Sequence, residues 1–487
     1  MSLQPNRLLG VYCKPCVFLL CEWGLARSFA ITNGEYPSNI GVRNRWINVF
    51  EGGHVNSKNY VLLLVMALFV TSREASAQTS VAITHVTVID VVSGTAQPDV
   101  TVVVTGSVIS AIAPTKELPV PNSARVVDAH GQFLIPGLWD MHVHLGNATE
   151  AALPVLVSYG ITGVRDMGSP SYATLRGWSN EALLGTRIGP RIVACGPILH
   201  NGPPYFWGVE ARTPTEAREV VRRLAEQNVD FIKVTSDIDR PTYFAVAEAA
   251  RKLGLPLAGH LPTNENGTGF AVSAVEASNA GHKSLEHGHG IPFSFDDKDP
   301  QLISTLLRNG TWVDPTITTY WARAHVHELA DKAAQDPRMK HIAPSFRQFW
   351  EAQLKDFGRN NEIQLKILEW RLAQISKLKK SGVPLLTGTD LGFAYVFPGD
   401  LIKELEFFVQ AGLSPLQALQ VATIGAARFL HKDWELGTVE TGKIADLVLL
   451  AANPLEDVHN LHLVRAVVLN GRFLDRAEID AAIPTFD

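Results

Sequence analysis

The chain has 487 residues, of which 46% are hydrophobic and 19% are charged, and its formal net charge is -5. This length and composition predict a globular protein with one large domain and a smaller companion. The charge lacks the basic excess typical of nucleic-acid binding, which argues against such a partner and favours a small soluble substrate.

The first predicted element is an apolar run near the start of the chain. Residues 60–70, YVLLLVMALFV, are fewer than the roughly 20 residues that span a bilayer. Lys58 precedes the run and the small residues ASA follow it, so we interpret residues 56–77 as a secretory signal peptide; a buried core helix is the alternative. Because a signal peptide normally begins a chain, residues 1–55 are interpreted as an over-called start or an extension, and residues 1–77 as a leader. We expect a secreted or periplasmic protein with no stable membrane span after removal of the leader.

The next segment and the last one both carry the pattern of short antiparallel strands. From residue 80, VAITHVTVIDVVSGTAQPDVTVVVTG alternates β-branched residues with turn signals, and residues 436–473 show the same pattern. Because each half leaves sheet edges that need partners, we predict one composite β-sandwich domain from residues 78–135 and 431–487. The central domain then comprises residues 136–430.

The central region alternates apolar strands with helical stretches such as TPTEAREVVRRLAEQN. Eight candidate strands occur in the order FLIPGLWDMHVH, ITGVRDM, RIVACGPIL, FIKVTS, LPLAGH, KSLEHG, TWVDPTITT and VPLLTGTD. This repetition predicts the α/β class, with a TIM-like (β/α)8 barrel. A doubly wound sheet is the alternative, but no GxGxxG motif follows the first strand. The long, mostly helical connection at residues 318–383 is predicted to form a cap over the barrel mouth.

Polar side chains stand at the ends of the predicted strands, where the site of a barrel enzyme lies. They are His142 and His144 on the first strand, Lys233 on the fourth, His260 on the fifth, His287 on the sixth and Asp390 on the eighth. Residues i and i+2 of a strand point the same way, so His142 and His144 would converge on one metal ion. One such histidine is explained equally well as a core or capping residue, but the whole set favours a metal site.

Two further histidine pairs are less informative. His325 and His327 also form an HxH pair, but in a helical pattern, where residues two apart point to nearly opposite sides. We interpret them as surface or cap residues. His289 would share a face with His287 if the strand continued, whereas Gly288 indicates that the strand has ended. The contribution of His289 is left open.

The stretches PGLWDMHVH, FIKVT, GH, LEHG and LLTGTD occur in this order between the two β segments. In this combination the chain resembles the amidohydrolase superfamily, and most closely the imidazolonepropionase-related branch that includes secreted Xaa-Pro dipeptidases. The resemblance extends over about residues 80–475. It implies a metal-dependent hydrolase that cleaves a C–N bond, of amide or peptide type, in a small substrate.

The resemblance also implies a role for each ligand. His142 and His144 would bind the more buried metal ion, and His260 and His287 the more exposed one. Asp390 would ligate the first ion and act as the catalytic proton shuttle. Two cations lower the pKa of a bridging water from near 16 toward about 7, which provides the attacking hydroxide. Asp390 would accept the proton of this water and deliver it to the leaving nitrogen.

Lys233 and Thr263 indicate the type of metal site. An ammonium group is a poor metal ligand, but a lysine kept neutral by burial takes up carbon dioxide as a carbamate, which bridges two cations. We therefore expect two divalent ions, with zinc as the predicted metal, and a carbamate on Lys233; a lysine that merely extends from a strand end is the alternative. Deaminase-like members of the superfamily need a carboxylate three residues after the fifth-strand histidine, where this chain has Thr263. This difference favours a binuclear hydrolase.

Asp140 lies two residues before His142 and shares its face of the strand. We expect its carboxylate to support the site by a hydrogen bond to a ligand imidazole. The alternative is that Asp140 simply fills the lower layer of the barrel.

Candidate substrate contacts come from the loops after the third and seventh strands. We expect His200 and Tyr320 to hold a carbonyl oxygen or a carboxylate, with Tyr205, Trp207 and Arg323 as weaker candidates. Packing of a lid is the alternative for all five.

Three function classes stay open. The first is an amide hydrolase, either dipeptidase- or prolidase-like or specific for N-acyl amino acids. The second is a lactonase or phosphotriesterase-like enzyme on the same binuclear site. The third is a non-catalytic binding barrel, which is disfavoured because no predicted ligand is missing. The sequence does not determine the substrate, the native metal or the oligomeric state, and an oligomer is compatible with it.

Overall fold

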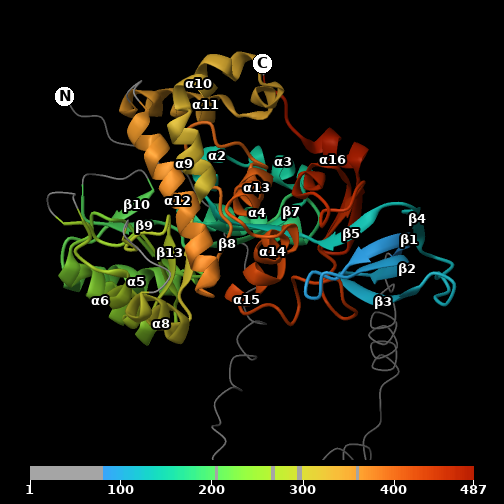
Figure 1. Cartoon of the computed structure of the whole chain (residues 1–487), viewed down its shortest axis with the longest axis horizontal. Coiled ribbons are helices and arrows are strands. Elements are labelled where there is room, and N and C mark those ends of the chain that lie inside the picture. Colours follow the sequence, from blue (N-terminus) through green and yellow to red (C-terminus); the bar gives the residue numbers. More distant parts are fainter. Residues whose placement is uncertain (1–79, 203–206, 265–268, 293–298, 358–360, 487) are drawn as a thin grey trace, which may run out of the picture. The chain divides into compact units, whose positions relative to one another are not determined.

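The computed structural model describes five stretches of the chain, which are residues 80–202, 207–264, 269–292, 299–357 and 361–486 (Figure 1). The chain divides into two compact units, residues 1–76 and 77–487, and all described residues belong to the second. The predicted leader and Tyr205 lie outside the described residues. Among the described helices, none is long and apolar enough to cross a membrane.

Strands from both ends of the described chain pair in one mixed sheet of eight strands. Their order is β17-β16-β15-β5-β1-β2-β3, and β4 pairs with β1. The bounds are β1(Ser80–Ile89), β2(Ala96–Thr105), β3(Val108–Pro114), β4(Arg125–Asp128), β5(Phe133–Pro136), β15(Leu447–Leu450), β16(Val464–Leu469) and β17(Arg472–Asp475). The two ends meet where β5 and β15 run antiparallel, with Ile135 opposite Val448. The hydrogen bonds thus join the two halves of the predicted composite domain in a single sheet.

This mixed sheet has a core on each face, because alternate side chains of a strand point to opposite sides. In β15, Leu447 and Leu449 pack with Leu134 in a small core formed within the sheet region. Val448 and Leu450, which alternate with Leu447 and Leu449 along the strand, belong to the large core of the central region. The sheet is therefore joined to the central region through buried apolar contacts.

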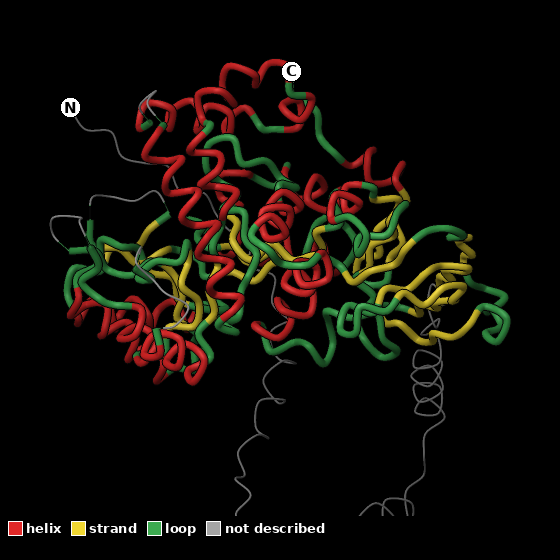
Figure 2. Tube along the Cα trace, viewed as in Figure 1, coloured by secondary structure: helices red, strands yellow, loops and turns green. Residues whose placement is uncertain are grey.

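The central region contains two parallel sheets, of order β6-β7-β8 and β10-β9-β11-β12-β13-β14. The bounds are β6(Leu138–Val143), β7(Ile161–Asp166), β8(Arg191–Ala194), β9(Ile198–His200), β10(Gly208–Glu210), β11(Ile232–Val234), β12(Leu257–Gly259), β13(His282–Glu286) and β14(Trp312–Asp314). Helices separate most of these strands along the chain (Figure 2), as a parallel arrangement requires. The chain is thus an α/β protein with parallel sheets and a mixed sheet.

The eighth predicted strand, in residues 383–390, forms only isolated bridges. Leu385 bridges to Val313 of β14, and Leu391 bridges to Val143 of β6, both in parallel orientation. This segment therefore lies between the last and the first parallel strand. Within the described part of the chain, however, continuous hydrogen-bonded ladders do not close the parallel strands into a ring.

The first predicted strand is two strands. FLIPGLWDMHVH is divided at Gly137, so that β5 belongs to the mixed sheet and β6 begins the parallel strands. At Gly137 the backbone passes so close to Thr162 that a Cβ atom would lie 1.9 Å from its Oγ1. Only glycine fits this crossing. The third predicted strand, RIVACGPIL, is likewise divided into β8 and β9.

Several helices that connect the strands begin at a residue whose side chain caps the first turn. Thr213 accepts a hydrogen bond from the backbone of Glu216 at the start of α5, and Asp239 does the same for Thr242 in α6. The bounds are α2(Leu145–Ala148), α3(Ala152–Ser158), α4(Tyr172–Leu183), α5(Pro214–Glu226), α6(Arg240–Lys252), α7(Ala274–Asn279), α8(Pro300–Asn309), α13(Leu401–Gln410), α14(Pro415–Gln420), η4(Val421–Gly425), α15(Ala426–Phe429), η5(Val458–His462) and α16(Arg476–Ala482).

The connection predicted as a helical cap is mostly helical. It contains α9(Ile317–Ala324), α10(Val326–Lys332), η1(Ala333–Gln335), η2(Pro337–His341), α11(Pro344–Gln353), η3(Leu354–Asp356) and α12(Glu362–Lys380). The long helix α12 packs against α9, which directly follows β14 (Figure 1). The cap is thereby held beside the carboxyl ends of the parallel strands.

Candidate metal centre

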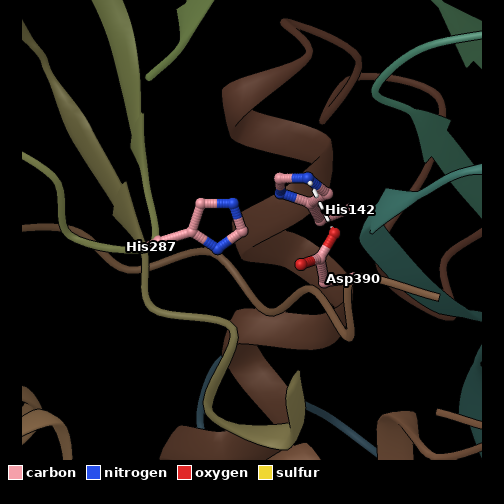
Figure 3. A group of neighbouring side chains, drawn as sticks. All are labelled: His142, His287 and Asp390. Carbon is pink, nitrogen blue, oxygen red and sulfur yellow. Dashed lines mark ion pairs between the residues drawn. The ribbon is translucent and has the colours of Figure 1, made fainter. Parts of the chain in front are cut away.

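Three of the predicted ligands form a tight group at the carboxyl ends of the parallel strands (Figure 3). Ligating atoms of His142, His287 and Asp390 all lie within 4.8 Å of one another, and the three side chains are buried. His142 is on β6, His287 directly follows β13, and Asp390 is in the segment between β14 and β6. The fold thus brings together residues from three distant parts of the sequence.

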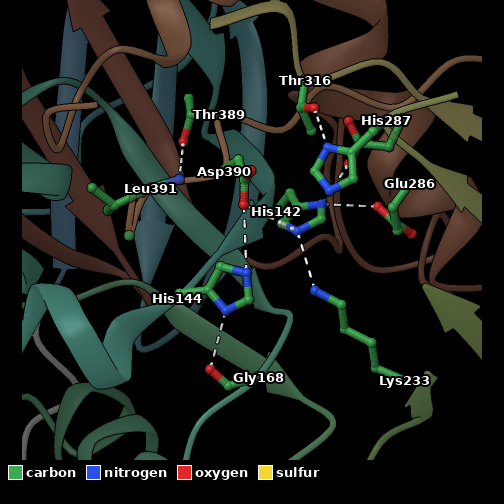
Figure 4. A network of polar contacts seen from close by, with 12 residues as sticks. His142, His144, Gly168, Lys233, Glu286, His287, Thr316, Thr389, Asp390 and Leu391 are labelled. Atoms are coloured by element: carbon green, nitrogen blue, oxygen red, sulfur yellow. Dashed lines mark hydrogen bonds and ion pairs between the residues drawn. The ribbon is translucent and has the colours of Figure 1, made fainter. Parts of the chain in front are cut away.

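His142 is oriented by a carboxylate behind it (Figure 4). Its Nδ1 lies 3.0 Å from Oε2 of Glu286, and its Nε2 lies 3.4 Å from Oδ1 of Asp390. We assign the proton to Nδ1, because the Glu286 carboxylate accepts it, which leaves the Nε2 lone pair toward Asp390. Burial, followed by the charge of Lys233, holds the pKa of His142 well below its usual range. The imidazole is therefore neutral, as a metal ligand must be.

His144 is oriented in the same way by a backbone carbonyl. Its Nδ1 donates to the carbonyl oxygen of Gly168 at 3.2 Å, and its Nε2 lies 3.4 Å from Oδ1 of Asp390. Trp207 stacks on this imidazole, with ring centroids 4.9 Å apart. His142 and His144 therefore present their Nε2 atoms to the same carboxylate oxygen, as the HxH spacing predicts.

Asp390 is the charged member of the group. Burial raises the pKa of its carboxyl, whereas positive charge at His142 and His144, which a bound cation would supply where the imidazoles are neutral, lowers this pKa to about 2. Among the described residues, no donor makes a hydrogen bond to either of its oxygens. Its φ of 62° lies in the left-handed region, which costs a non-glycine residue about 1 kcal/mol or more. An ionised, buried carboxylate in a strained backbone position is typical of a functional site.

Asp140 supports the backbone of the site and not an imidazole. Its Oδ1 accepts hydrogen bonds from the backbone N–H groups of Thr389 at 3.0 Å and His142 at 3.2 Å. Its Oδ2 accepts a hydrogen bond of 2.7 Å from the hydroxyl of Thr389. Asp140 thus fastens the residue before Asp390 to β6, which differs from the predicted hydrogen bond to a ligand ring.

The remaining imidazoles form a second group beside the first. The ring centroid of His287 lies 4.9 Å from those of both His142 and His260, and His289 lies 4.8 Å from His260. Burial holds the pKa values of His260 and His287 well below the usual range and lowers that of His289 to about 3. Nε2 of His260 has no hydrogen-bond partner in the described structure, whereas Nδ1 of His287 lies 2.6 Å from Oγ1 of Thr316. β13 ends at Glu286, yet His289 still faces this group, which the sequence left open.

Lys233 points into the same group from β11. Its Nζ lies 3.4 Å from Nε2 of His142, and its side chain is almost completely buried. Burial lowers the pKa of its amine. The structure therefore places the amine beside the imidazoles, in the neutral-favouring environment that carbamate formation needs.

The sequence reasoning missed the network that supports His142. Arg165, on β7, donates to Glu286 at 3.0 Å and to the backbone carbonyl of Met141 at 2.6 Å, and it lies 3.5 Å from Asp314. Burial, reinforced by the charge of Glu286, raises the pKa of Asp314 well above its usual range. His142, Glu286 and Asp314 also have ligand atoms within 4.8 Å of one another, but the guanidinium of Arg165 already neutralises this set. A charged residue inside an apolar strand, as in ITGVRDM, is the only sequence signal of this network.

The predicted substrate residues lie on different sides of the group. Tyr320, on α9, has its ring 6.4 Å from that of His287, edge to face. His200 is buried at the end of β9, where its backbone lies opposite that of Glu210 in the pairing of β9 with β10. The cap histidines have other partners: His325 binds the carbonyl of Trp321. They are therefore separate from the metal-ligating imidazoles.

Two arginines beside Tyr320 form a cationic corner, of which the sequence identified only Arg323. The guanidinium carbon of Arg323 lies 5.8 Å from the ring centroid of Tyr320, and that of Arg371, from α12, lies 5.0 Å from it. Arg371 also donates to the carbonyl of Gly288 at 3.2 Å. The Nε–H groups of both arginines are buried without an acceptor in the described part of the chain. Arg371 could not be found from sequence, because α12 lies far from the strand ends along the chain.

The donor set fits divalent metal ions. It combines the buried imidazoles of His142, His144 and His287, the half-buried one of His260, one buried carboxylate without hydrogen-bond donors and one buried amine beside them. An uncompensated carboxylate is expensive to bury, and a cation coordinated by it and by neutral imidazoles removes this cost. Nitrogen and oxygen ligands of this kind are those that zinc and similar metals prefer.

Comparisons with known proteins identify the family of the chain. Ochratoxinase of Aspergillus niger is 23% identical over 427 residues, which cover 75% of this chain and 80% of that protein. Two solved structures share the fold, each at 24% identity: a putative prolidase from Bifidobacterium longum (TM-score 0.67, covering 84% of this chain and 98% of that one) and a Xaa-Pro dipeptidase with bound methionine (TM-score 0.63, covering 82% and 100%). The model of the amidohydrolase family matches residues 133–474. The predicted resemblance is confirmed, and the chain belongs to the amidohydrolase family of enzymes, which hydrolyse C–N bonds.

Proposed function

We propose that the chain is a binuclear, zinc-dependent hydrolase that cleaves an amide bond in a small substrate bearing a carboxylate, such as a dipeptide or an N-acyl amino acid. The observation that carries this proposal is the ionised carboxylate of Asp390, buried without hydrogen-bond donors from the described residues and faced by the Nε2 atoms of His142 and His144. The proposal further takes the two parallel sheets and the segment at residues 383–390 as one TIM-like barrel. The strand order and the isolated bridges of Leu385 and Leu391 support this closure.

The predicted ligands divide into two sets. His142, His144 and Asp390 would hold one cation, and His260 and His287 would hold the other. When bound, the two cations would acidify a water molecule and polarise the carbonyl group of the substrate. Glu286 and the carbonyl of Gly168 keep the ligating nitrogens of the first set free of protons, so these side chains are ready to bind metal.

Lys233 would connect the two sets as a carbamate. Its neutral amine would form an N–C bond with carbon dioxide and release one proton, which leaves an anionic carboxylate at the end of the side chain. Burial supports this reaction, because it lowers the pKa of the amine and so maintains the nucleophilic form. The new negative charge would balance the second cation.

Asp390 would move the proton of the reaction. Its low pKa keeps the carboxylate ionised in the resting site, so it can accept a proton from water. The same group would then deliver this proton to the leaving nitrogen, since expulsion of an amine without protonation is slow. The Nε2 atoms of His142 and His144 each lie 3.4 Å from one of its oxygens, so a cation bound by all three side chains would hold the carboxylate in place for both steps.

Arg323 and Arg371 support a substrate that carries a carboxylate. Their guanidinium groups flank Tyr320 beside His287, and their Nε–H groups lack acceptors within the described residues. Guanidinium groups bind carboxylates through two parallel hydrogen bonds, and such a bond would satisfy the buried donors. Dipeptides and N-acyl amino acids both present a carboxylate close to the scissile amide bond.

The first test of this function is a substrate panel on the enzyme loaded with zinc in the presence of bicarbonate. Dipeptides and N-acyl amino acids are expected to be hydrolysed, and their carboxamide counterparts more slowly by about tenfold or more, since the lost ion pair is worth at least ~1.4 kcal/mol. Faster turnover of lactones or aryl phosphates would favour the alternative hydrolase, and no turnover of any class would contradict the proposal.

Metal content supplies the matched control for this test. His142→Ala should reduce the bound zinc measured by elemental analysis. His327 belongs to the other HxH pair and contacts the carbonyl of Phe357, so His327→Ala should leave the bound zinc unchanged. Equal zinc in both variants would contradict the assignment of the ligands.

We also propose that the enzyme is exported, on the strength of the signal-peptide pattern in residues 56–77. N-terminal sequencing of the exported protein should then begin at Gln78. An intact Met1 on the exported form would contradict this proposal.

A further inference from the structure

A second cavity lies at the end of the parallel strands opposite to the metal centre. Its volume is about 390 Å³, which is within the range of small-molecule sites. Several strands contribute residues at or just before their first positions: Phe231 precedes β11, Pro256 precedes β12, and Trp312 begins β14. The predicted metal ligands His260 and His287 follow the last residues of β12 and β13. Because the strands are parallel, the cavity and the metal centre lie at opposite ends.

The apolar part of the wall of this basal cavity contains three aromatic rings. Phe231, Trp312 and Phe429 line it, together with Leu430, which caps the end of α15. Trp312 and Phe429 contact each other edge to face, with ring centroids 5.7 Å apart. Flat apolar walls of this kind fit a compact apolar or aromatic group.

The basal cavity also carries an excess of positive charge. Lys283, Arg428, Lys432 and Arg165 line it, against the single carboxyl of Asp230, whose pKa is raised by burial. Lys432 is paired with Glu435 at 2.7 Å. Lys283 and Arg428 form no ion pair with any described residue, and both are exposed at the rim. An apolar interior with unpaired cations at its rim is complementary to a molecule with an apolar body and an anionic head.

Arg165 forms the inner wall and links this cavity to the supports of the metal centre. Its guanidinium carbon lies 5.1 Å from the ring centroid of Phe429 and 5.7 Å from that of Phe231, and both rings line the cavity. The same guanidinium donates to Glu286, the carboxylate behind His142. A molecule in the cavity would therefore contact the side chain that holds a predicted ligand in place.

We propose that the basal cavity binds a small organic monocarboxylate, with its apolar body against Phe231 and Phe429 and its carboxylate at Arg428 and Lys283. The carboxyl of Asp230 also lines the cavity, which favours a ligand with a single negative charge over a more highly charged one. This site is separate from the proposed hydrolytic centre, because its lining residues include none of the predicted metal ligands.

The test is calorimetric titration of the full, zinc-loaded protein with 4-phenylbutyrate and with its neutral counterpart 4-phenylbutan-1-ol. Both are expected to bind, the acid more tightly. Arg428→Glu should weaken the binding of the acid by about tenfold or more and that of the alcohol by less than about twofold. Arg251→Glu, at an exposed arginine on α6 away from the cavity, is the matched control for the change in net charge and should alter neither affinity.

A second variant separates this cavity from the metal centre. Leu430→Trp should fill the space beside Phe429 and abolish the binding of both compounds, with hydrolytic activity and melting temperature retained as evidence of folding. Binding of the acid that persists in Leu430→Trp would show that it binds elsewhere, at the metal centre for example, and would overturn the proposal. An absence of binding to the unaltered protein, or equal effects of Arg428→Glu on acid and alcohol, would overturn it as well.

Discussion

At the scale of single residues, the predicted metal ligands can be recognised in the sequence more easily than the side chains that support them. The predicted ligands stand at strand ends in recognisable spacings, such as the HxH of His142 and His144. Glu286 contacts His142 and Arg165, and both of these residues lie more than a hundred positions away from it in the chain. The charged Arg165 inside an apolar strand indicates a buried polar contact, but nothing in the local sequence identifies its partner. Only the tertiary structure brings Arg165 and Glu286 to His142.

Glu286→Gln tests the support of His142. The amide keeps the shape of the side chain but removes the negative charge that accepts the Nδ1 proton and pairs with Arg165. Metal affinity, measured by competition with a chelator, is expected to fall about 10- to 100-fold. Glu276→Gln, which alters an exposed carboxylate on α7, is the control and should change nothing in this assay. Unchanged zinc retention in Glu286→Gln would show that the carboxylate does not support the ligand.

Asp390→Asn tests the proton transfer. The substitution retains an oxygen beside His142 and His144 but removes the group that accepts and returns the proton. Turnover of the best substrate is expected to fall about 10²- to 10⁴-fold, the usual contribution of a general acid or base. Zinc content, measured in the same preparation, should remain largely intact because the imidazoles persist. A variant with near-normal turnover would contradict the proton role.

At the scale of elements, a side chain from another helix caps the first turn of the cap helix α9. Glu404, on α13, accepts hydrogen bonds from the backbone N–H groups of Ile317 at 2.8 Å and Thr318 at 2.7 Å. Thr316, the residue before α9, supplies no side-chain cap and has a φ of 46°, in the left-handed region. The position of α9, and with it Tyr320, therefore depends on a carboxyl group from a distant element.

Glu404 predicts a pH dependence of stability. Burial raises its pKa from 4.5 to about 8 in spite of the hydrogen bonds from Thr318 and Ile317, so the folded protein retains a proton that the unfolded chain releases above pH 4.5. The contribution of protonated Glu404 to the free energy of unfolding is complete below pH 4.5 and is lost as the pH rises through about 8. The free energy of unfolding, measured relative to Glu404→Gln, should therefore decrease by roughly 2–4 kcal/mol between about pH 5 and pH 9. A difference that is constant over this range would contradict the raised pKa.

At the scale of the whole described unit, one apolar core joins the mixed sheet to the parallel strands. Ile135 and Val448, from opposite ends of the described chain, belong to the same large core as Val143 and Leu285. Asp446 adds a polar connection at this junction. It lies 2.5 Å from Arg191 at the start of β8 and accepts a hydrogen bond of 2.6 Å from the backbone of Asn470. The mixed sheet and the parallel strands should therefore unfold together.

Asp446→Ala tests whether the mixed sheet and the parallel strands unfold cooperatively. Loss of the buried carboxylate leaves the half-buried Arg191 without its partner, which should cost about 2–3 kcal/mol. Calorimetry is expected to show one transition, shifted to lower temperature. Glu181→Ala removes the exposed partner of Arg187 and should change stability by less than about 1 kcal/mol. Two separate transitions in Asp446→Ala would mean that the mixed sheet and the parallel strands are independent units.

The sequence by itself determined the class of the fold and the family, because periodicity and ordered motifs are local properties that folding preserves. The alternation in VAITHVTVID and the HxH of His142 and His144 are examples, and the ligand assignments drawn from such motifs stay predictions. Only the tertiary structure decided the division of the first strand at Gly137, the hydrogen bonds from Asp140 to the backbone, and the contacts of Glu286, Arg165 and Arg371. These depend on which distant segments lie side by side. That proximity is set by the packing of the whole chain and leaves no local pattern in the sequence.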